Sequence, residues 1–193
     1  KRNPEGSTGT IGFRLALPGA DRLPVLHLAF DDGSGTTAAD SSPNGNDGTL
    51  TNGPTWTTGV HGGALSLDGT DDYVSAPDAD ALNFGTSSFT IQLVVRTTND
   101  ADAELQIIGK NAGLEHCWRL VQERDANHLR FQARGTESED AVESSTAIND
   151  GLWHAVAAVR DPSRWSLYVD GVLEGTLDMP PGDVTNTEPI VIG

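Results

Sequence analysis

Two short apolar strands that enclose a long irregular crossing constrain the fold of this chain more than any other feature of its 193 residues. Side chains of a β-strand point to opposite faces in turn, so Leu26, Leu28 and Phe30 share one face of the first strand. The crossing is dense in Asp, Ser, Asn, Pro and Gly, which favour turns. In the second strand Leu65 and Leu67 share a face. This stretch predicts strands joined by ordered loops.

The chain beyond residue 77 continues as a series of strands. Phe89, Ile91, Leu93 and Val95 alternate with more polar residues, as expected for a sheet with one buried face. Three further strand candidates, separated by polar loops, cover residues 105–110, 118–122 and 129–133. No segment shows the 3.6-residue period of an amphipathic helix. The pattern therefore predicts an all-β domain.

The segment 153–160 is apolar on both of its faces. One face carries Trp153, Ala155, Ala157 and Val159, and the other carries Val156 and Ala158. We expect a central strand that is covered on both sides, because an exposed strand face is normally polar. Asp170-Gly171 follows and predicts a two-residue hairpin turn, whose positions need positive φ angles.

Three runs of sequence resemble one family. They are F-D-D-G-S-G-T-T at 30–37, D-S-S-P-N-G-N-D-G-T-L at 40–50 and G-G-A-L-S-L-D-G-T-D-D-Y-V at 62–74. They resemble the laminin-G-like, concanavalin-A-like domains of bacterial surface proteins and carbohydrate enzymes. G-L-W-H-A-V-A-A-V-R-D at 151–161 matches the same pattern, with Ala155 where a second His is common, and Val94 stands where the family often has Trp. The resemblance implies a two-sheet antiparallel jelly-roll β-sandwich over residues 25–193.

Residues 1–24 differ from the rest and are expected to form a strand and a linker. Ile11, Phe13, Leu15 and Leu17 alternate with other residues up to Pro18-Gly19. The run R-N-P-E-G-S-T-G-T-I-G-F-R-L-A-L at 2–17 resembles the C-terminal strand of the formylglycine-generating-enzyme (sulfatase-modifying-factor) fold. That resemblance implies a remnant of a preceding domain.

The chain stops at Ile190–Gly193, where the jelly-roll family usually continues with a last strand of the form I-D-E-V-R-I-Y. A sandwich without that strand exposes a sheet edge, which folded proteins normally cover. Two explanations stay open. Residues 11–17 of this chain or of a neighbouring copy fill the gap by strand addition, or the natural sequence continues beyond Gly193.

The charge of the chain excludes some partners. Its formal net charge is -16, from 28 acidic and 12 basic residues, so nucleic acid and anionic membranes are poor partners. No apolar run is long enough to cross a membrane. The acidity fits either cation binding or a strongly hydrated surface suited to high salt or solubility. The single Cys117 permits no internal disulfide and is expected to be a small buried thiol.

Acidic and amide side chains gather in the loops around the first two strands. Calcium prefers about 6 to 8 oxygen ligands of these kinds, and many domains of the resembled family hold a structural Ca²⁺ near such loops. The best candidate ligands are Asp31, Asp32, Asp40 and Asn44. The alternative is that Asp40, Asn44 and Asp47 cap turns and that Asp71-Asp72 are solvated.

No catalytic site is visible in the sequence. Glycosidases use two carboxylates, and some jelly-roll glucanases place them in an E-x-D-x-E pattern. The nearest run, 137–143, departs from it, since Glu137, Glu139 and Glu143 would share a face and Asp140 the other. We expect a solvated charge run in an exposed loop. The five His residues lack metal-ligand spacing and a nucleophile partner.

A binding face is the better prediction. Sugar-binding sheets combine aromatic and polar side chains, and the candidates on neighbouring strands are Trp118, Arg119, Arg130, Gln132 and Arg134. Trp56, Trp153 and Trp165 are expected in the core. By resemblance we expect a non-catalytic extracellular or cell-surface module that binds a glycan or a surface protein. The alternatives are a homo-oligomeric structural subunit that donates its N-terminal strand, and a polysaccharide-cleaving enzyme using Glu139 and Glu143.

Overall fold

The structure, a computed structural model, describes residues 23–100, 104–112, 115–124, 127–134, 139–178 and 182–193. It also describes the backbone of 12–16, while the side chains of residues 12–16, 112, 115, 134, 139 and 140 lie outside the description. Within this part of the chain, no helix has the length and apolar character needed to span a membrane.

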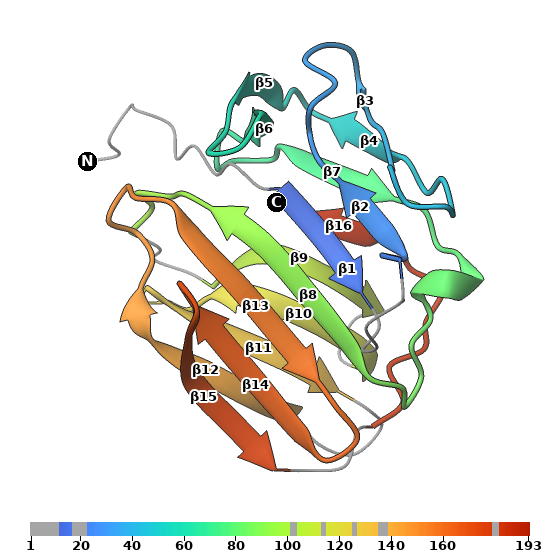
Figure 1. The fold of residues 1–193 in the computed structure, drawn as a ribbon, viewed down its shortest axis with the longest axis vertical. Coiled ribbons are helices and arrows are strands. Elements are labelled where there is room, and N and C mark those ends of the chain that lie inside the picture. The colour runs from blue at the N-terminus through green and yellow to red at the C-terminus, as the bar shows by residue number, and fades with distance from the viewer. Residues whose placement is uncertain are drawn as a thin grey trace.

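Two antiparallel sheets are stacked face to face (Figure 1). The front sheet, turned to the viewer, has the strand order β15-β14-β13-β8-β1-β2. Its strands are β1 (Gly12–Ala16), β2 (Leu26–Leu28), β8 (Phe89–Val95), β13 (His154–Arg160), β14 (Arg164–Val169) and β15 (Val172–Asp178). This arrangement confirms the predicted two-sheet antiparallel β-sandwich.

The back sheet has eight strands in the order β12-β11-β10-β9-β16-β7-β4-β3. They are β3 (Thr37–Ala38), β4 (Gly48–Thr51), β7 (Tyr73–Ala76), β9 (Leu105–Ala112), β10 (Glu115–Gln122), β11 (His128–Arg134), β12 (Glu139–Ala147) and β16 (Ile190–Ile192). A separate ribbon joins β5 (Thr55–Thr58) to β6 (Gly63–Ser66), and one 3-10 turn spans Asp80–Leu82.

The core lies between the two sheets and is centred on large aromatic rings. The ring of Phe89 lies 5.6 Å from Trp118 and 6.1 Å from Phe131, and Phe131 lies 5.6 Å from Trp165, between ring centroids. All four side chains are fully buried or nearly so. Offset and edge-on ring pairs of this kind add to the burial of apolar area. The core therefore gives both sheets a rigid common support.

The residues that strand alternation predicts to face the core are buried in the structure. Leu26, Leu28, Phe30, Leu65 and Leu67 are all buried, as are the odd-numbered residues of β8. Cys117 is buried, as expected for a small thiol. The predicted hairpin turn is also present, because Asp170 and Gly171 have φ angles of 52° and 80° between β14 and β15.

Strand β13 differs from its prediction in the burial of one of its two faces. It is central in the front sheet, between β14 and β8, as expected. Val156 and Ala158 are buried, but Ala155 is exposed and Ala157 and Val159 are only half-buried. The expectation that both faces are covered is wrong, because one face packs on the core and the other forms part of the outer surface. This strand therefore leaves an apolar strip open.

Strand β1 lies between β8 and β2 and pairs with both in antiparallel fashion. The backbone of Phe13 is opposite Leu93 on one side and Leu28 on the other. In this structure the N-terminal strand of the chain is thus added to its own front sheet. Of the two sources that the sequence left open for this strand, the same chain supplies it here.

The acidic run near residue 140 is not wholly a loop. Glu139–Ala147 forms β12, an edge strand of the back sheet that pairs with β11. The prediction of an exposed loop is therefore wrong for this part, while residues 135–138, including Glu137, lie outside the described residues. Glu143 is half-exposed, and its carboxylate lies 3.7 Å from Nε of Arg130 and 3.5 Å from Nε2 of His128.

Candidate functional site

Two large hollows lie on the described surface. We call them the end pocket, of about 510 Å³, and the face groove, of about 820 Å³. The end pocket combines an apolar floor with several polar side chains, as ligand-binding sites do, and is therefore the candidate site.

The end pocket is built from segments far apart in the sequence. The loop between β6 and β7 supplies one wall, and residues of β9 and β16 and the segment after β8 supply the others. Its polar lining includes Thr70, Asp71, Asp72, Tyr73, Asn99 and Gln106. Its apolar lining includes Leu67, Val95, Ile107 and Val191. An apolar floor with a polar rim suits a ligand that has both kinds of surface.

The loop 68–72 is shaped by its own carboxylates. Asp68 accepts hydrogen bonds from the backbone N–H groups of Thr70 and Asp71, and Asp72 accepts one from the N–H of Asp68. One carboxylate oxygen each from Asp68, Asp71 and Asp72 lies within 4.8 Å of the other two. Such short side-chain to backbone bonds are the reason that Asp stabilises turns. The loop therefore holds three carboxylates together, and Asp71 and Asp72 among them line the pocket.

The electrostatics of this loop differ between its carboxylates. The pKa of Asp72 is raised, because burial and the neighbouring charges of Asp68 and Asp71 outweigh the hydrogen bond from the Asp68 N–H. The pKa of Asp68 is lowered, chiefly by the hydrogen bond from the N–H of Thr70. Asp72 is therefore a carboxyl whose charge is poorly compensated and which a hydroxyl donor from a ligand would stabilise.

A polar cluster on the outer face of the back sheet borders the end pocket. Glu104, which lines the pocket, forms an ion pair with Arg119, and the pocket residue Gln106 accepts a hydrogen bond from the side chain of Asn111. A Cβ on Gly109 would lie 2.9 Å from Cβ of Arg119 and 3.0 Å from Oε1 of Gln106. Glycine at this position therefore lets the two polar side chains approach each other.

The predicted ligand-binding residues are only partly brought together. Arg119 on β10 and Gln132 on β11 are direct backbone partners, and Gln132 is buried. Arg130 forms ion pairs with Glu123 and Glu143 further along the sheet. Of Arg134 the structure describes the backbone alone, paired with Cys117 and Glu139. Among these residues, Arg119 is linked to the end pocket by its ion pair with Glu104, which lines the pocket.

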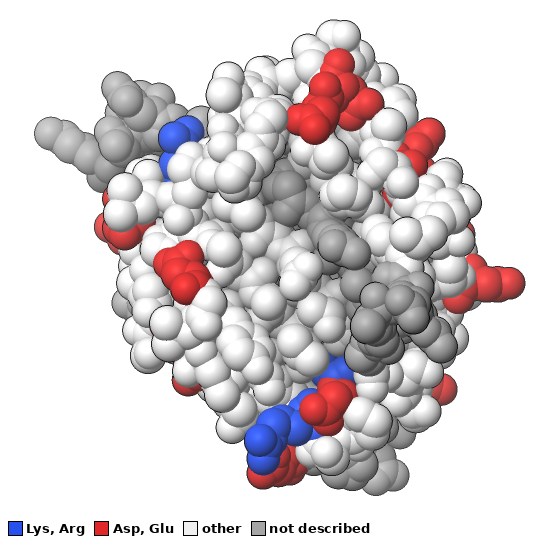
Figure 2. Space-filling view, in the orientation of Figure 1, with Lys and Arg blue, Asp and Glu red and all other residues white. Residues whose placement is uncertain are grey.

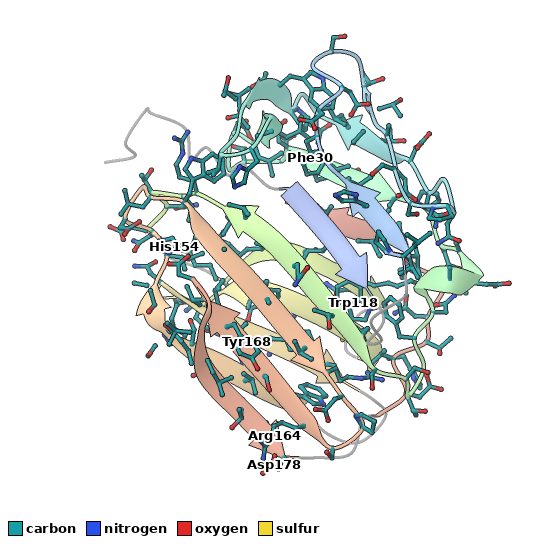
Figure 3. All side chains as sticks on the ribbon, in the orientation of Figure 1. Phe30, Trp118, His154, Arg164, Tyr168 and Asp178 are labelled. Atoms are coloured by element: carbon teal, nitrogen blue, oxygen red, sulfur yellow. The ribbon has the colours of Figure 1, made fainter. Side chains whose placement is uncertain are left out.

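The prediction of Trp118 as a binding platform is wrong. Trp118 is fully buried between the sheets, where it contacts Phe84 and Phe89 (Figure 3). Neighbouring residues of a strand point to opposite faces, so Arg119 faces outward because Trp118 faces the core. Trp165 is buried as predicted, and Trp56 packs partly against the core. Trp153 is only half-buried and lies under the guanidinium of Arg96, 4.9 Å from the ring centroid.

Three of the predicted calcium ligands accept hydrogen bonds from groups of the protein itself. Asp40 accepts four, from the N–H groups of His27, Ser42 and Asn46 and from the hydroxyl of Ser42. Its two carboxylate oxygens are thus already saturated by protein donors. Asp31 accepts the N–H of Gly63, and Asp32 accepts that of Ala39. These contacts of Asp40 are those of the turn-capping alternative, and its role as a calcium ligand stays a prediction.

Asn44 and Asp47, in the same crossing as Asp40, also form hydrogen bonds within the protein. Asn44 donates its side-chain amide to the carbonyl of Val25, and Asp47 accepts the N–H of Asp40. Both therefore hold the crossing in place. Whether the chain binds calcium stays a prediction that these contacts do not decide.

Sequence reasoning missed most of the end pocket. The run D-G-T-D-D-Y is visible in the sequence as an acidic loop, for which calcium binding and solvation of Asp71 and Asp72 were the two alternatives. Tyr73, Asn99 and Gln106 gave no signal, because each lies on an ordinary strand or loop and meets the other walls of the pocket only in the folded chain. Only the fold brings these groups together.

Comparison with known proteins supports the fold. No curated protein matches the chain. Among solved structures, domain 4 of AbnA, a GH43 extracellular arabinanase from Geobacillus stearothermophilus in complex with arabinotriose, has a TM-score of 0.73 and 20% identity, covering 92% of this chain and 84% of that one. The binding domain of botulinum neurotoxin DC in complex with SialylT has a TM-score of 0.65 and 16% identity, covering 84% and 44%. The botulinum neurotoxin serotype C1 binding domain has a TM-score of 0.61 and 15% identity, covering 84% and 43%.

These identities show a shared fold, and the chain spans less than half the length of the two neurotoxin domains. None of these comparisons supports the resemblance of residues 1–24 to the formylglycine-generating-enzyme fold, and the matching family model begins only at residue 68. That model, described as the concanavalin A-like lectin/glucanases superfamily, matches residues 68–193, about two thirds of the sequence. The chain belongs to the concanavalin A-like lectin/glucanases superfamily.

Proposed function

We propose that this chain is a non-catalytic glycan-binding module of an extracellular or cell-surface protein and that the end pocket holds a sugar. The observation that carries the proposal is the lining of this pocket. Val95, Ile107 and Val191 offer an apolar surface to the face of a sugar ring. Asp72 and the half-buried Tyr73 offer hydrogen-bond partners to its hydroxyl groups.

The poor compensation of Asp72 supports the same proposal. Its raised pKa reflects burial and two neighbouring carboxylates, which the single hydrogen bond from the N–H of Asp68 offsets only in part. A sugar presents several hydroxyl donors at once and would satisfy this carboxylate. A hydrogen bond to a charged group contributes about 1.5–3 kcal/mol. The pocket therefore gains more from a polyhydroxylated ligand than from an apolar one.

The solved structures supply the first probes. The AbnA domain was solved with arabinotriose, and the neurotoxin DC domain with SialylT. The identities of 20% and 16% do not carry a ligand over to this chain, but they support a search among neutral and sialylated oligosaccharides. The AbnA enzyme is extracellular by its own description, which supports the setting proposed here.

The test is isothermal titration of the chain with arabinotriose, cello-oligosaccharides and a sialylated trisaccharide. We expect at least one sugar to bind and expect Asp72→Asn and Tyr73→Ala to weaken its binding about tenfold or more. Asp80→Asn is the matched control, because Asp80 is exposed and lies outside the pocket. Absence of binding across the panel would overturn the proposal, and unchanged binding by both pocket variants would exclude this pocket.

A further inference from the structure

A buried charged side chain lies on one of the strands that line the end pocket. The charged side chains visible in Figure 2 lie on the outside of the molecule, where water solvates them. Lys110 on β9 is an exception, because its side chain is fully buried. A buried ion pair is seldom more stabilising than apolar residues of similar volume. The presence of Lys110 therefore calls for an explanation other than stability.

The ammonium group of Lys110 is held by oxygens from two other segments. It lies 2.7 Å from Oδ1 of Asp78, 2.6 Å from the carbonyl oxygen of Asn186 and 3.2 Å from Oδ1 of Asn186. These acceptors satisfy all the N–H donors of an ammonium group. Asn186 in turn donates its side-chain amide to the carbonyl of Lys110. We call Lys110, Asp78 and Asn186 the ammonium clamp.

The ammonium clamp joins three strands that are neighbours in the back sheet. Lys110 belongs to β9, Asp78 follows β7, and Asn186 precedes β16. Strand β16 lies between β9 and β7. Its first residue, Ile190, is opposite Lys110 on one side and Ala76 on the other. The clamp therefore ties the three strands together at one end of their pairing.

The other end of the same pairing forms walls of the end pocket. The pocket is lined by Tyr73 of β7, Ile107 of β9, Val191 of β16 and Gly193, which follows β16. The N–H of Gly193 donates to the carbonyl of Ile107. Ile107 is on the order of 10 Å along β9 from Lys110. The clamp thus lies outside the pocket and acts on it through the strands.

The position of β16 determines how the pocket wall packs on the loop that carries Asp72. A Cβ on Gly193 would lie 2.7 Å from the carbonyl oxygen of Asp72 and 3.0 Å from Cδ1 of Leu67. The backbone of Gly193 therefore packs closely on two residues of the pocket. If a one-residue shift brought Ile192 to this place, its Cβ would not fit, and every side chain of β16 would turn to the opposite face.

The apolar pattern of β16 does not fix its register. The strand reads Ile190-Val191-Ile192, with Ile190 and Ile192 buried and Val191 half-buried. Register is normally set by the contrast between an apolar and a polar face, and this strand has apolar residues on both. Specification of register is the best-supported role of buried polar and ionic groups. The ammonium clamp supplies the specification that the apolar residues lack.

We infer that Lys110 is a positioning residue of the end pocket, whose ammonium group fixes the register of β16 between β7 and β9. Lys110 does not line the pocket, and it acts through Asn186 on the segment that carries Val191 and Gly193. The inference rests on the proposed function for its binding measurement. The position of β16 is measurable without a ligand.

The test compares Lys110→Met with the unaltered chain in two measurements. The first is titration with the arabinotriose, cello-oligosaccharide or sialylated trisaccharide that binds the unaltered chain. We expect the affinity to fall about tenfold or more, as for the loss of one hydrogen bond to a charged group. The second is amide hydrogen exchange, in which the N–H of Gly193 should exchange several-fold faster relative to the amides of β8 and β13. Asn186→Ala removes part of the clamp and should change both measurements in the same direction.

Two further variants separate positioning from a general loss of stability. Asp78→Asn keeps an oxygen that accepts a hydrogen bond from the ammonium group, and it should keep most of the affinity. Val169→Ala is the matched control, because Val169 is buried on β14 and lies outside the pocket. This substitution should lower the free energy of unfolding without an effect on the affinity.

The outcomes separate this inference from the proposed function. If Lys110→Met and Asn186→Ala keep both the affinity and the relative exchange rate of Gly193, the inference fails and the proposed function stands. If Val169→Ala lowers the affinity as much as Lys110→Met does, the effect is one of stability and the inference fails. If no sugar binds to the unaltered chain, the proposed function fails, and the exchange rate of Gly193 alone decides the inference. Thermal unfolding verifies that each variant folds, and Asn186→Ala keeps the test decisive should Lys110→Met fail to fold.

Discussion

The imidazole Nδ1 of His154 lies 2.8 Å from a carboxylate oxygen of Asp170. The other ring nitrogen lies 3.1 Å from Asp150, and the second oxygen of Asp170 accepts the N–H of Ala155. His154 is buried at the start of β13, while Asp170 forms the hairpin turn between β14 and β15. The charged ring therefore fastens three segments of the front sheet together at one end.

This arrangement predicts a pH-dependent stability. Although burial opposes it, hydrogen bonds to Asp170 and Asp150 raise the pKa of His154 above its ordinary value of 6.5. A raised pKa in the folded state means that the stabilisation is complete below about pH 6.5 and is lost as pH rises through the folded pKa. We expect His154→Gln to cost about 1–3 kcal/mol at about pH 5.5 and less at about pH 8.5.

Urea unfolding of both proteins across this range measures the difference. If the difference in free energy of unfolding between the two proteins stays constant with pH, the charged His154 ring is not the source of the stabilisation. His61→Gln, at an exposed histidine, is the matched control and should leave the free energy of unfolding nearly unchanged.

Asp40 is predicted to stabilise the fold through turn capping and without metal. Asp40→Ala leaves three backbone N–H groups and the Ser42 hydroxyl without their acceptor, and we expect a loss of about 2–4 kcal/mol. Chemical unfolding in calcium and in EDTA distinguishes the two roles. Capping predicts the same loss in both buffers, whereas a loss confined to the calcium buffer would show that Asp40 is a ligand. Addition of Ca²⁺ to the unaltered chain tests calcium binding itself by a rise in melting temperature.

Asp40 also contributes to acid sensitivity. Burial opposes the charged form, but the hydrogen bonds from His27, Ser42 and Asn46 lower the pKa of Asp40 below its ordinary value of 3.8. The stabilisation is present above that value and is lost as pH falls through the folded pKa. The loss caused by Asp40→Ala should therefore shrink toward strongly acidic pH, and a loss that persists there would contradict the charged acceptor.

Glu174 is predicted to lock the edge strand β12 to the front sheet. Its carboxylate on β15 accepts the N–H and hydroxyl groups of both Ser145 and Thr146 on β12. Glu174→Ala removes all four bonds, and we expect a loss of about 1–3 kcal/mol. The measurement is urea unfolding, with Glu188→Ala as a control because Glu188 is exposed. Equal effects of the two substitutions would show that the four bonds contribute nothing specific.

The ion pair between Lys110 and Asp78 predicts that substitution of Asp78 costs more stability than substitution of Lys110. The Lys110 ammonium is fully buried, 2.7 Å from Asp78 and 2.6 Å from the carbonyl of Asn186. Asp78→Ala leaves a buried charge without its counter-ion, which is strongly destabilising, by about 3 kcal/mol or more when both partners are deeply buried. Since Asp78 is partly exposed, we expect about 1–3 kcal/mol here.

Lys110→Met should cost less, because it removes the buried charge and leaves Asp78 in contact with water. Thermal unfolding of both variants gives the order of stability. A lower stability of Lys110→Met than of Asp78→Ala would contradict this explanation.

The sequence by itself determined which residues share a strand face. Alternation correctly grouped Leu26 with Leu28 and Phe89 with Ile91, because the period of a strand is a property of the local backbone. The turn at Asp170-Gly171 was equally local, since it depends on two φ angles. These features, with the family resemblance, were sufficient for the β-sandwich.

Only the tertiary structure decided which face is inside and what meets at a site. Alternation separates Trp118 from Arg119 but does not say which of them faces the core, and β13 is apolar on both faces although one is open. The end pocket joins Asp72, Gln106 and Val191, which are brought together by pairing between distant strands. Burial and long-range strand pairing depend on the packing of the whole chain, so they cannot be predicted from a local sequence pattern.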